Sequence, residues 1–351
     1  MTALRILADD LTGALDSVAR LVGRFGAVPV AWADDPQAPL LALDCGTRDL
    51  SREQARLRVT ALAPALAGAD IAFKKLDSLL RGHAAAEIAC CLPGRYNAVV
   101  IAPAFPRQGR ITRHGRQLAH GSDVGVDLAA ELAAEGIDVS RRNPGDDLPA
   151  GVSLWDAESD ADLDAIAAMA RGRVLWCGTG GLAGALGRAG TPSRNANPSV
   201  PWDEPQPGEA VLALVGSDHP TGRAQLETCR IRLTLTGTDD AVPQHGTAID
   251  VALPAGLDRA EAARRINAAF AGLLARIARP SALVVTGGAT LRGVCEALGA
   301  LGLTVDGEMA PGIPASRLIG GRWDGLRIVS KSGAFGNAGM LAALLDGRTP
   351  Q

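Results

Sequence analysis

Short apolar runs alternate with amphipathic helical patterns along this 351-residue chain, and this alternation constrains the fold more than any other feature. A strand, a helix and a second strand in succession require a crossover connection, which produces a mostly parallel sheet. In the first half the expected elements are strand Leu4–Ala8, helix 13–25, strands 27–32 and 40–44, helix 51–67 opened by Ser51 as N-cap, strand 70–74, helix 83–91, strand 97–102, helix near 126–135, strand 152–155, helix 160–170, strand RVLWCG and a helix from 180.

The alternation resumes after a segment, 191–208, that holds five prolines and almost no apolar periodicity. Proline stiffens the chain and removes a backbone donor, so this segment is predicted to be a linker between domains 1–190 and 209–351. The elements expected after it are strands 210–216 and 248–254, helix 258–278, strand 281–288, helix 290–300, strands near 303–309 and 326–330, and helix 337–345. Both halves are therefore predicted to be three-layer α/β domains with mostly parallel sheets.

The composition argues against several classes of partner. The 35 basic and 38 acidic side chains nearly cancel, and the chain has no basic tract and few aromatic residues, so nucleic acid is not expected as a main partner. No apolar run approaches the roughly 18 residues of a membrane span, and the N-terminus lacks the features of a signal peptide. The six scattered cysteines lack metal-ligand spacing and are expected to be small buried residues of a protein in the reducing cytoplasm.

The first candidate for chemistry is the segment 6–16, ILADDLTGALD, in which an apolar strand ends at Asp9 and Asp10. Ligands of open α/β sheets bind at the carboxyl ends of strands. Two carboxylates there can hold a cation, accept a hydroxyl proton or bind sugar hydroxyls. The alternative is that one of them merely caps the helix that follows. A phosphatase-type D-x-D-x-T signature does not fit, because Ala8 stands two positions before Asp10.

The second candidate is the segment 73–82, FKKLDSLLRG. It contains Lys74 and Lys75, although the chain has 32 Arg and just three Lys. A lysine kept where arginine is the general surface cation indicates a compact point charge for an anionic ligand. Asp77, Ser78 and Arg81 follow within the same segment. The alternative is a solvated charged loop.

The third candidate is a Gly/Pro-rich segment, 102–117, which is expected to be a loop after strand 97–102. Arg110 and its neighbouring arginines could clamp an acid or a phosphate there, and His114 is a less favoured candidate for a catalytic base. A basic surface loop explains the same residues equally well, so this segment is weak support on its own.

The second half contains three turns in which a predicted strand runs into small residues and then into a helix. They are LVGSDHPTG with Ser217, VVTGGATLRG with Gly287, Gly288 and Thr290, and IVSKSGAFG with Lys331, Gly333 and Gly336. Glycines let the backbone approach a phosphate, and the N–H groups at a helix N-terminus then bind it. Neither a Walker element nor a dinucleotide fingerprint is present. The three turns predict a nucleotide site of another kind, with Lys331 as the phosphate-binding cation.

Taken together, the motifs resemble the four-carbon acid-sugar kinase family. The matching segments are A-D-D-L-T-G-A-x-D (8–16), K-K-x-D-S-x-L-R-G (74–82), P-A-F-P-x-x-G-R-x-T (103–112), G-G-x-T (287–290) and K-S-G-x-F-G (331–336). The resemblance implies an N-terminal acid-sugar domain and a C-terminal ATP-binding domain, with an active-site cleft between them. It also implies phosphorylation of the terminal hydroxyl of tetronic acids such as 3-oxo-tetronate, threonate or erythronate.

The resemblance assigns the candidate residues to two sides. Asp10 and Asp77 are the candidate catalytic bases, with Asp10 favoured, and the acid-sugar side comprises Asp9, Lys74, Lys75, Ser78, Arg81 and Arg110. The ATP side comprises Ser217, Gly287, Gly288, Thr290, Lys331, Gly333 and Gly336. ATP and Mg²⁺ are the expected cofactors, without an assigned metal ligand, and a homo-oligomer is left open.

Two other functions stay open at this stage. An acid-sugar sensor that has lost phosphotransfer would explain Ala289 and Ala334, which replace the usual acidic residue and the usual glycine of the family motifs. A different acid-sugar enzyme, such as an aldolase with a Schiff-base lysine at 74–75, would leave the three glycine turns without a purpose. A dehydrogenase would need a dinucleotide fingerprint that the chain lacks.

Overall fold

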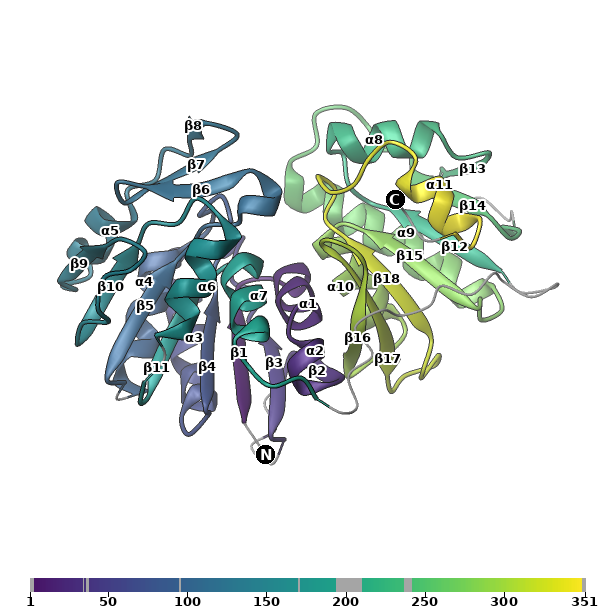
Figure 1. Ribbon diagram of the computed structural model, residues 1–351. Coiled ribbons are helices and arrows are strands. Elements are labelled where there is room, and N and C mark those ends of the chain that lie inside the picture. Colours follow the sequence, from purple (N-terminus) through teal and green to yellow (C-terminus); the bar gives the residue numbers. More distant parts are fainter. Residues whose placement is uncertain are drawn as a thin grey trace. The chain divides into compact units, whose positions relative to one another are not determined.

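A computed structural model of the chain describes residues 3–33, 35, 38–94, 96–169, 171–193, 210–236 and 242–348. The chain divides into two compact units, Met1–Ala196 and Asn197–Gln351 (Figure 1). Residues 194–208 of the proposed linker 191–208 lie outside the described residues. The exact limits of the two domains therefore stay a prediction.

The sheet of the first unit has the strand order β2-β3-β1-β4-β11-β5-β10-β9, and the pairings between these strands are parallel. Its strands are β1 (Leu4–Ala8), β2 (Val28–Ala31), β3 (Leu40–Asp44), β4 (Ile71–Lys75), β5 (Ala98–Ala102), β9 (Val139–Arg142), β10 (Gly151–Trp155) and β11 (Val174–Gly178). The central strands are buried on both faces, as expected for a parallel sheet covered by helices on both sides.

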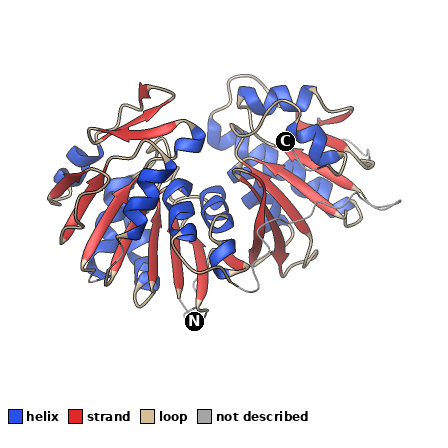
Figure 2. Ribbon diagram, viewed as in Figure 1, coloured by secondary structure: helices blue, strands red, loops and turns tan. Residues whose placement is uncertain are grey.

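Two groups of helices flank this sheet (Figure 2). One group, with α1 and α6 packed on α7, and the other, with α3 and α5 packed on α4, supply the two covering layers. The helices are α1 (Leu11–Ala19), α2 (Val22–Phe25), α3 (Arg52–Leu62), α4 (Ala84–Cys91), α5 (Leu128–Ala134), α6 (Asp160–Ala168) and α7 (Gly180–Arg188), with 3₁₀ turns at Ala63–Leu66, Leu92–Gly94 and Pro106–Gln108. As predicted, Ser51 caps α3, here in a reciprocal capping box with Gln54.

Two details of this unit differ from the sequence prediction. The single helix expected over 13–25 is two helices, because the chain turns at Arg20 and Leu21 and thereby buries Leu21. The loop expected over 102–117 instead contains most of a small antiparallel sheet of β6 (Arg110–Arg113), β7 (Arg116–Ala119) and β8 (Ser122–Asp123). The turn between β6 and β7 needs positive φ at His114 and Gly115, which a search for apolar alternation does not detect.

The sheet of the second unit has the order β13-β14-β12-β15-β18-β17-β16. It is parallel from β13 to β18, and β17 pairs antiparallel with both β18 and β16. The strands are β12 (Val211–Val215), β13 (Ile231–Leu235), β14 (Thr247–Val251), β15 (Ala282–Thr286), β16 (Gly302–Ala310), β17 (Ile313–Ile319) and β18 (Arg327–Lys331). Helices α9 (Arg259–Arg276) and α10 (Gly288–Ala297) pack together, as do α8 (Pro220–Glu227) and α11 (Met340–Leu345).

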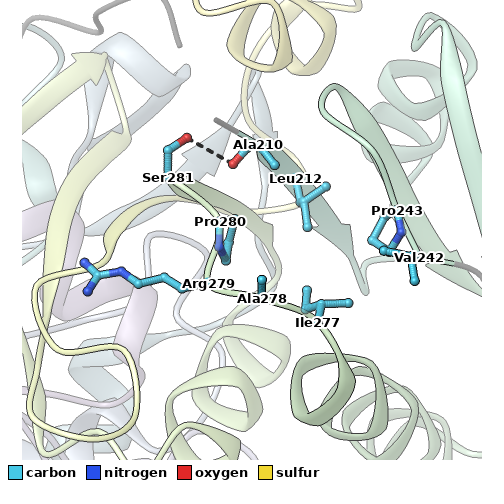
Figure 3. Close-up of a pocket in the computed structure, with 9 residues that line it drawn as sticks. All are labelled: Ala210, Leu212, Val242, Pro243, Ile277, Ala278, Arg279, Pro280 and Ser281. Atoms are coloured by element: carbon cyan, nitrogen blue, oxygen red, sulfur yellow. Dashed lines mark hydrogen bonds between the residues drawn. The ribbon is translucent and has the colours of Figure 1, made fainter. Parts of the chain in front are cut away.

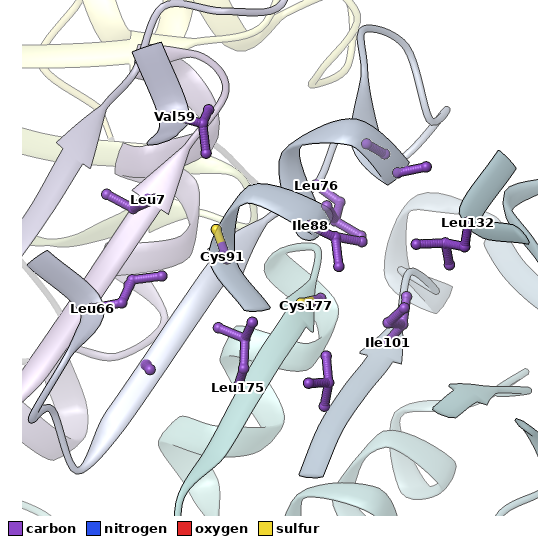
Figure 4. Packing of buried hydrophobic residues seen from close by; sticks show 14 of the residues in the cluster. Leu7, Val59, Leu66, Leu76, Ile88, Cys91, Ile101, Leu132, Leu175 and Cys177 are labelled. Carbon is purple, nitrogen blue, oxygen red and sulfur yellow. The ribbon is translucent and has the colours of Figure 1, made fainter. Parts of the chain in front are cut away.

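Each unit has a hydrophobic core of its own. In the first unit, Leu7, Ile88 and Leu175 belong to one cluster between the sheet and the α3–α4 layer (Figure 4). In the second unit, Val284, Val329 and Leu344 belong to another. The predicted class, two α/β domains with mostly parallel sheets, is confirmed. The six cysteines are free thiols. Among the described residues, no helix is both long and apolar enough to cross a membrane.

Candidate functional site

The first unit has a topological switch point at β1. The chain runs from β1 to β2 and β3 on one side, and then to β4 on the other side of β1. Because the strands are parallel, the residues that follow β1, β3 and β4 lie at the same edge of the sheet. Open α/β sheets bind ligands in the crevice at such a point. Asp9 and Asp10 follow β1, Arg48 follows β3, and Asp77 follows β4.

Arg48 joins the three carboxylates at this edge. Its Nε and Nη2 donate to the two oxygens of Asp9 at 2.7 and 2.9 Å, and its Nη1 donates to Asp10 Oδ2 at 2.6 Å. Its Nη2 also lies 3.6 Å from Asp77 Oδ1. Burial alone would raise the pKa of Asp9, but the charges of Arg48 and Lys75 outweigh burial and hold this pKa below its ordinary value.

Asp10 is the N-cap of α1. Its Oδ1 accepts from the Gly13 N–H at 2.8 Å, and its Oδ2 accepts from the Thr12 hydroxyl at 2.6 Å. The capping function considered for this residue is therefore present, and it fixes the carboxylate at the helix N-terminus. The Asp10 side chain is 20% exposed, against 6% for Asp9 and 7% for Asp77, which makes it the most accessible carboxylate of the three.

Asp77 is the hub of the loop that follows β4. Its carboxylate binds Arg81 through Nε and Nη2 at 2.8 and 2.7 Å and also accepts the backbone N–H groups of Leu79 and Arg81. Burial tends to raise the pKa of Asp77, but the hydrogen bonds from Arg81 and the charge of Arg48 hold it well below the ordinary value. Leu80, buried with φ of 55°, takes a strained left-handed conformation inside this loop.

The two lysines of β4 have different surroundings. Lys74 is fully buried, and its ammonium lies 2.7 Å from Glu87 Oε2 on α4. Burial would lower the pKa of Lys74, and the charges of Glu87 and Asp9 raise it above the ordinary value instead. The position of Lys74 thus gives no support to its predicted contact with substrate, and we leave it out of the site.

Lys75 is next to α1. Its Nζ donates to the Leu76 carbonyl at 2.7 Å and lies 3.0 Å from the point where a side chain at Gly13 would begin. Within the described part of the chain, no carboxylate comes within ion-pair distance of it. Lys75 therefore keeps two N–H donors beside Asp10.

The small β6–β8 sheet contributes Arg110, whereas His114 lies elsewhere. Arg110 is buried, 9% exposed, and its Nη1 donates to the Gln108 carbonyl at 2.6 Å. Burial lowers the pKa of its guanidinium. His114 is exposed at the β6–β7 turn, where its backbone N–H binds Asp156, so its position does not support a role as a base. Ser78 contributes its carbonyl, which accepts from Gln117 at 3.0 Å.

In the second unit, the residues predicted for the nucleotide come from the ends of three neighbouring strands. A side chain at Gly216 would clash with Thr290, and one at Gly333 would clash with Ser217. Glycine at these two positions therefore lets the turns after β12, β15 and β18 approach one another closely. Gly287, with φ of 104°, donates its N–H to the Lys331 carbonyl at 3.0 Å and is followed by Gly288 at the first turn of α10.

Lys331 is a buried cation for which the described residues supply no counter-charge. It is 1% exposed, and its Nζ has no hydrogen-bond partner among the described residues. Burial lowers the pKa of this ammonium to about 8. Thr286 pairs with Lys331 across β15 and β18, and its hydroxyl likewise has no partner in the described part. Two unsatisfied polar groups on one face of the sheet are what a missing anionic ligand would leave.

Gly336, also predicted for this site, lies apart from the Ser217–Gly333 contact. It adopts a φ of 87°, and a side chain there would clash with Met340. The adjoining turn is held by Gln225 of α8, whose amide donates to the carbonyls of Phe335 and Asn337 at 3.0 and 2.8 Å. Gly336 therefore shapes the turn, and its contact with a nucleotide stays a prediction.

Two surface hollows lie far along the strands from these groups. One, of about 550 Å³, opens beside Ala210 and Ser281, which precede β12 and β15 (Figure 3). The other, of about 740 Å³, opens beside Asn97 and Ala98 at the start of β5. Both are at the amino ends of strands, and neither is lined by a predicted site residue. The chemistry of the side chains, rather than the depth of the surface, therefore locates the candidate sites.

Sequence reasoning missed Arg48, which contacts three carboxylates. The sequence did contain a signal for Arg48, because this charged residue lies in the segment C-G-T-R-D directly after the predicted strand 40–44. It also missed Glu87, the partner of Lys74, and Gln117, which ties β7 to the loop after β4. Neither had a motif of its own, because each acts through residues distant in the sequence.

Two domain profiles match this chain. The one described as sugar-binding N-terminal domain matches residues 4–141, and the one described as nucleotide-binding C-terminal domain matches residues 233–341. The D-threonate kinase of Cupriavidus necator is 31% identical, over 98% of this chain and 99% of its own length. The D-erythronate kinase of Heliobacterium modesticaldum is 27% identical, over 99% of this chain and 97% of its own length.

The fold is also found in solved structures. A Salmonella typhimurium protein described as a tRNA synthase superimposes with a TM-score of 0.78 at 18% identity, covering 100% of both chains. A Haemophilus influenzae protein superimposes with a TM-score of 0.70 at 17% identity, covering 98% of this chain and 99% of its own. At these identities the likeness concerns the fold alone.

Proposed function

This chain belongs to the four-carbon acid sugar kinase family, and we propose that it transfers the terminal phosphoryl group of ATP to the C4 hydroxyl of a four-carbon sugar acid. Membership makes it a phosphotransferase with an alcohol group as acceptor. The choice of ATP as donor, and of the acid, is our proposal. D-threonate and D-erythronate, which the relatives' names contain, are the first acceptors to test, followed by 3-oxo-tetronate.

The observation that carries the proposal is the geometry of Asp10. Kinase chemistry needs positioning and charge neutralisation more than covalent catalysis. Asp10 is fixed by α1 and Arg48, and it is still the most accessible carboxylate at the switch point. We propose that Asp10 accepts the proton of the attacking hydroxyl. Asp77 is the less suitable base, because its side chain is 7% exposed against 20% for Asp10, and its carboxylate accepts four hydrogen bonds from Arg81 and Leu79, one more than Asp10 accepts.

Lys75 is suited to the hydroxyl end of the acceptor. Its two remaining N–H donors are next to Asp10, so it can orient a substrate hydroxyl and offset negative charge that develops there. Arg81 contributes indirectly, by holding Asp77 and the loop in place. Ser78 is expected to act through the same loop, and Asp9 by fixing Arg48.

The donor side fits a nucleotide. Lys331 offers a buried ammonium that has no partner among the described residues, and the N-terminus of α10, which no side chain caps, offers backbone N–H groups after Gly287. Ser217 and Thr290 bring hydroxyls to the same turns. ATP supplies the phosphoryl group, and these residues would hold its phosphates.

The chain's own residues do not fit a protein-held metal ion. No group of three His, Cys, Asp or Glu side chains able to bind a metal occurs among the described residues. Mg²⁺ stays a prediction, as a companion of the ATP phosphates.

ADP release coupled to a panel of tetronates, with ATP as donor, tests the proposal. We expect release that depends on both ATP and one four-carbon acid, and a product phosphorylated at C4. If the protein binds an acid tightly but releases ADP with no acid of the panel, the result would support the acid-sugar sensor instead. Consumption of an acid without ATP would support an aldolase.

A further inference from the structure

Arg110 is a buried guanidinium whose counter-charge is not supplied by the described part of the chain. It is 9% exposed, and its Nε has no hydrogen-bond partner there. Among the described residues, its side chain donates one hydrogen bond, to the neutral carbonyl of Gln108. The other two arginines of this region differ, because Arg48 and Arg81 each bind a carboxylate through two nitrogens. Burying a cation without a charged partner costs free energy, so the surroundings of Arg110 fit an anionic ligand.

The hydrogen bonds of the small sheet tie the strand that carries Arg110 to the loop after β4. Arg110 and Thr112 alternate with exposed or partly exposed residues along β6, so they share its buried face. Thr112 donates to Gln117 Oε1 at 2.8 Å, and the amide of Gln117 donates to the Ser78 carbonyl at 3.0 Å. The charges of Asp77 and Arg81 both act on Arg110. The face that carries Arg110 is therefore tied to the acceptor site.

The charges of the acceptor site do not balance. Three carboxylates, on Asp9, Asp10 and Asp77, face four cations, on Arg48, Arg81, Lys75 and Arg110. One positive charge is left over, which matches the single carboxylate of a sugar acid. Lys75 lies beside Gly13 and Asp10 at the start of α1, whereas Arg110 lies on β6, within the influence of the charges of Asp77 and Arg81. The two cations that lack a carboxylate partner are therefore suited to different ends of a ligand.

We propose that Arg110 binds the carboxylate of the sugar acid and so orients its far end, with the C4 hydroxyl, toward Asp10 and Lys75. This inference rests on the proposed function and adds the residue that selects acids. An uncharged analogue of the same length would leave the Arg110 guanidinium buried and unpaired, and such sites reject analogues that lack the expected partner group.

The test compares D-threonate with its neutral amide, D-threonamide, which keeps the shape and the C4 hydroxyl but loses the charge. Wild type should prefer the acid by about 100-fold in kcat/KM. Arg110→Gln should lose about 100-fold on the acid and less than about 3-fold on the amide. Arg110→Lys, which keeps a charge but not the planar fork, should fall between them. Arg113→Gln is the matched control, because Arg113 is an exposed arginine of the same strand that pairs with Glu158.

Equal losses on acid and amide in Arg110→Gln would show a merely structural role and overturn the inference, as would wild-type selectivity in that variant. If Arg110→Gln does not fold, the ratio of kcat/KM for D-threonate to that for D-threonamide is compared between wild type and Arg110→Lys instead. If wild type phosphorylates nothing in the tetronate panel, the proposed function fails. The inference is then judged separately, from the calorimetric affinities of D-threonate and D-threonamide for wild type and Arg110→Lys.

Discussion

Single residues decide the electrostatics of both candidate sites. Arg48 forms ion pairs with Asp9 and Asp10 and approaches Asp77, so one side chain keeps three carboxylates together at the switch point. Lys331 is the opposite case, a buried charge that the described residues leave uncompensated. The ion pairs of Arg48 hold the acceptor site in a fixed arrangement before substrate binds. The unpaired charge of Lys331 instead fits an anionic ligand.

Asp10→Asn should lower kcat by on the order of 10³-fold, because an amide cannot accept the hydroxyl proton. Asparagine is as good an N-cap as aspartate, so α1 should keep its start through the Gly13 N–H, while the ion pair with Arg48 is lost. ATP affinity, measured by calorimetry, should be unchanged, since the residues proposed for ATP all belong to the second unit. Asp127→Asn, a change at the N-cap of α5, is the control and should retain wild-type turnover. Wild-type turnover in Asp10→Asn would remove Asp10 from the mechanism.

Lys331 gives a prediction about pH and stability. The pKa of Lys331 in the folded protein is about 8, below the unfolded value near 10.4. The stability linked to this group is therefore complete above the unfolded pKa and is lost as the pH falls through 8. Without nucleotide, Lys331→Met should be about 3 kcal/mol more stable than wild type at pH 7, and the difference should shrink toward pH 10.5.

Denaturant unfolding at several pH values measures this difference, and calorimetry measures the associated loss of function. Lys331→Met should fail to bind ATP, whereas wild-type affinity should decrease as the pH rises above 8 and the ammonium loses its proton. Lys331→Arg is the control for charge, because arginine stays protonated throughout this range. A pH-independent difference in stability between wild type and Lys331→Met would contradict the assignment.

At the scale of elements, close approach between turns explains why glycines occur where they do. Gly333 follows β18 and faces Ser217 after β12, and no side chain fits between them. The contact joins two turns that are far apart in the sequence. The 331–336 turn is held on its other side by Gln225 of α8.

Gly333→Ala should therefore displace this turn and raise the KM for ATP by about 10-fold or more, because the added methyl would overlap Ser217. The KM for the sugar acid should stay unchanged. Gly339→Ala is the matched control, since Gly339 has an ordinary φ of −83° and a methyl group there would come no closer than 3.9 Å to Asn337. Equal effects of the two substitutions on the KM for ATP would argue against the contact.

The elements also show the limits of periodicity. Buried parallel strands such as β5 and β15 are apolar runs and were predicted within two residues at each end. The strands β6 to β8 were missed, because they contain few aliphatic residues and bury a guanidinium and an amide in their place. The pattern there resembles a loop until the partners of Arg110 and Gln117 are known.

At the scale of the whole molecule, each unit combines a core of its own with one candidate site. Independent cores predict independent folding. Fragments 1–196 and 197–351, produced separately, should each show cooperative thermal unfolding. The first should bind D-threonate and the second ATP, each with the affinity of the full chain within about 10-fold, and neither should release ADP alone. Loss of cooperative unfolding in either fragment would show that its core depends on the other.

The sequence by itself determined the α/β class, the division into two halves and the segments that carry chemistry, because apolar periodicity and strand-to-helix turns are local properties. Only the tertiary structure decided which charged side chains form ion pairs within the protein and which do not. Lys74 and Lys75 are adjacent in the sequence, yet Lys74 is neutralised by Glu87 and Lys75 points to Asp10's turn. Arg48 meets Asp9 across 39 residues. Ion pairing depends on strand order, and strand order arises from contacts that no local pattern encodes.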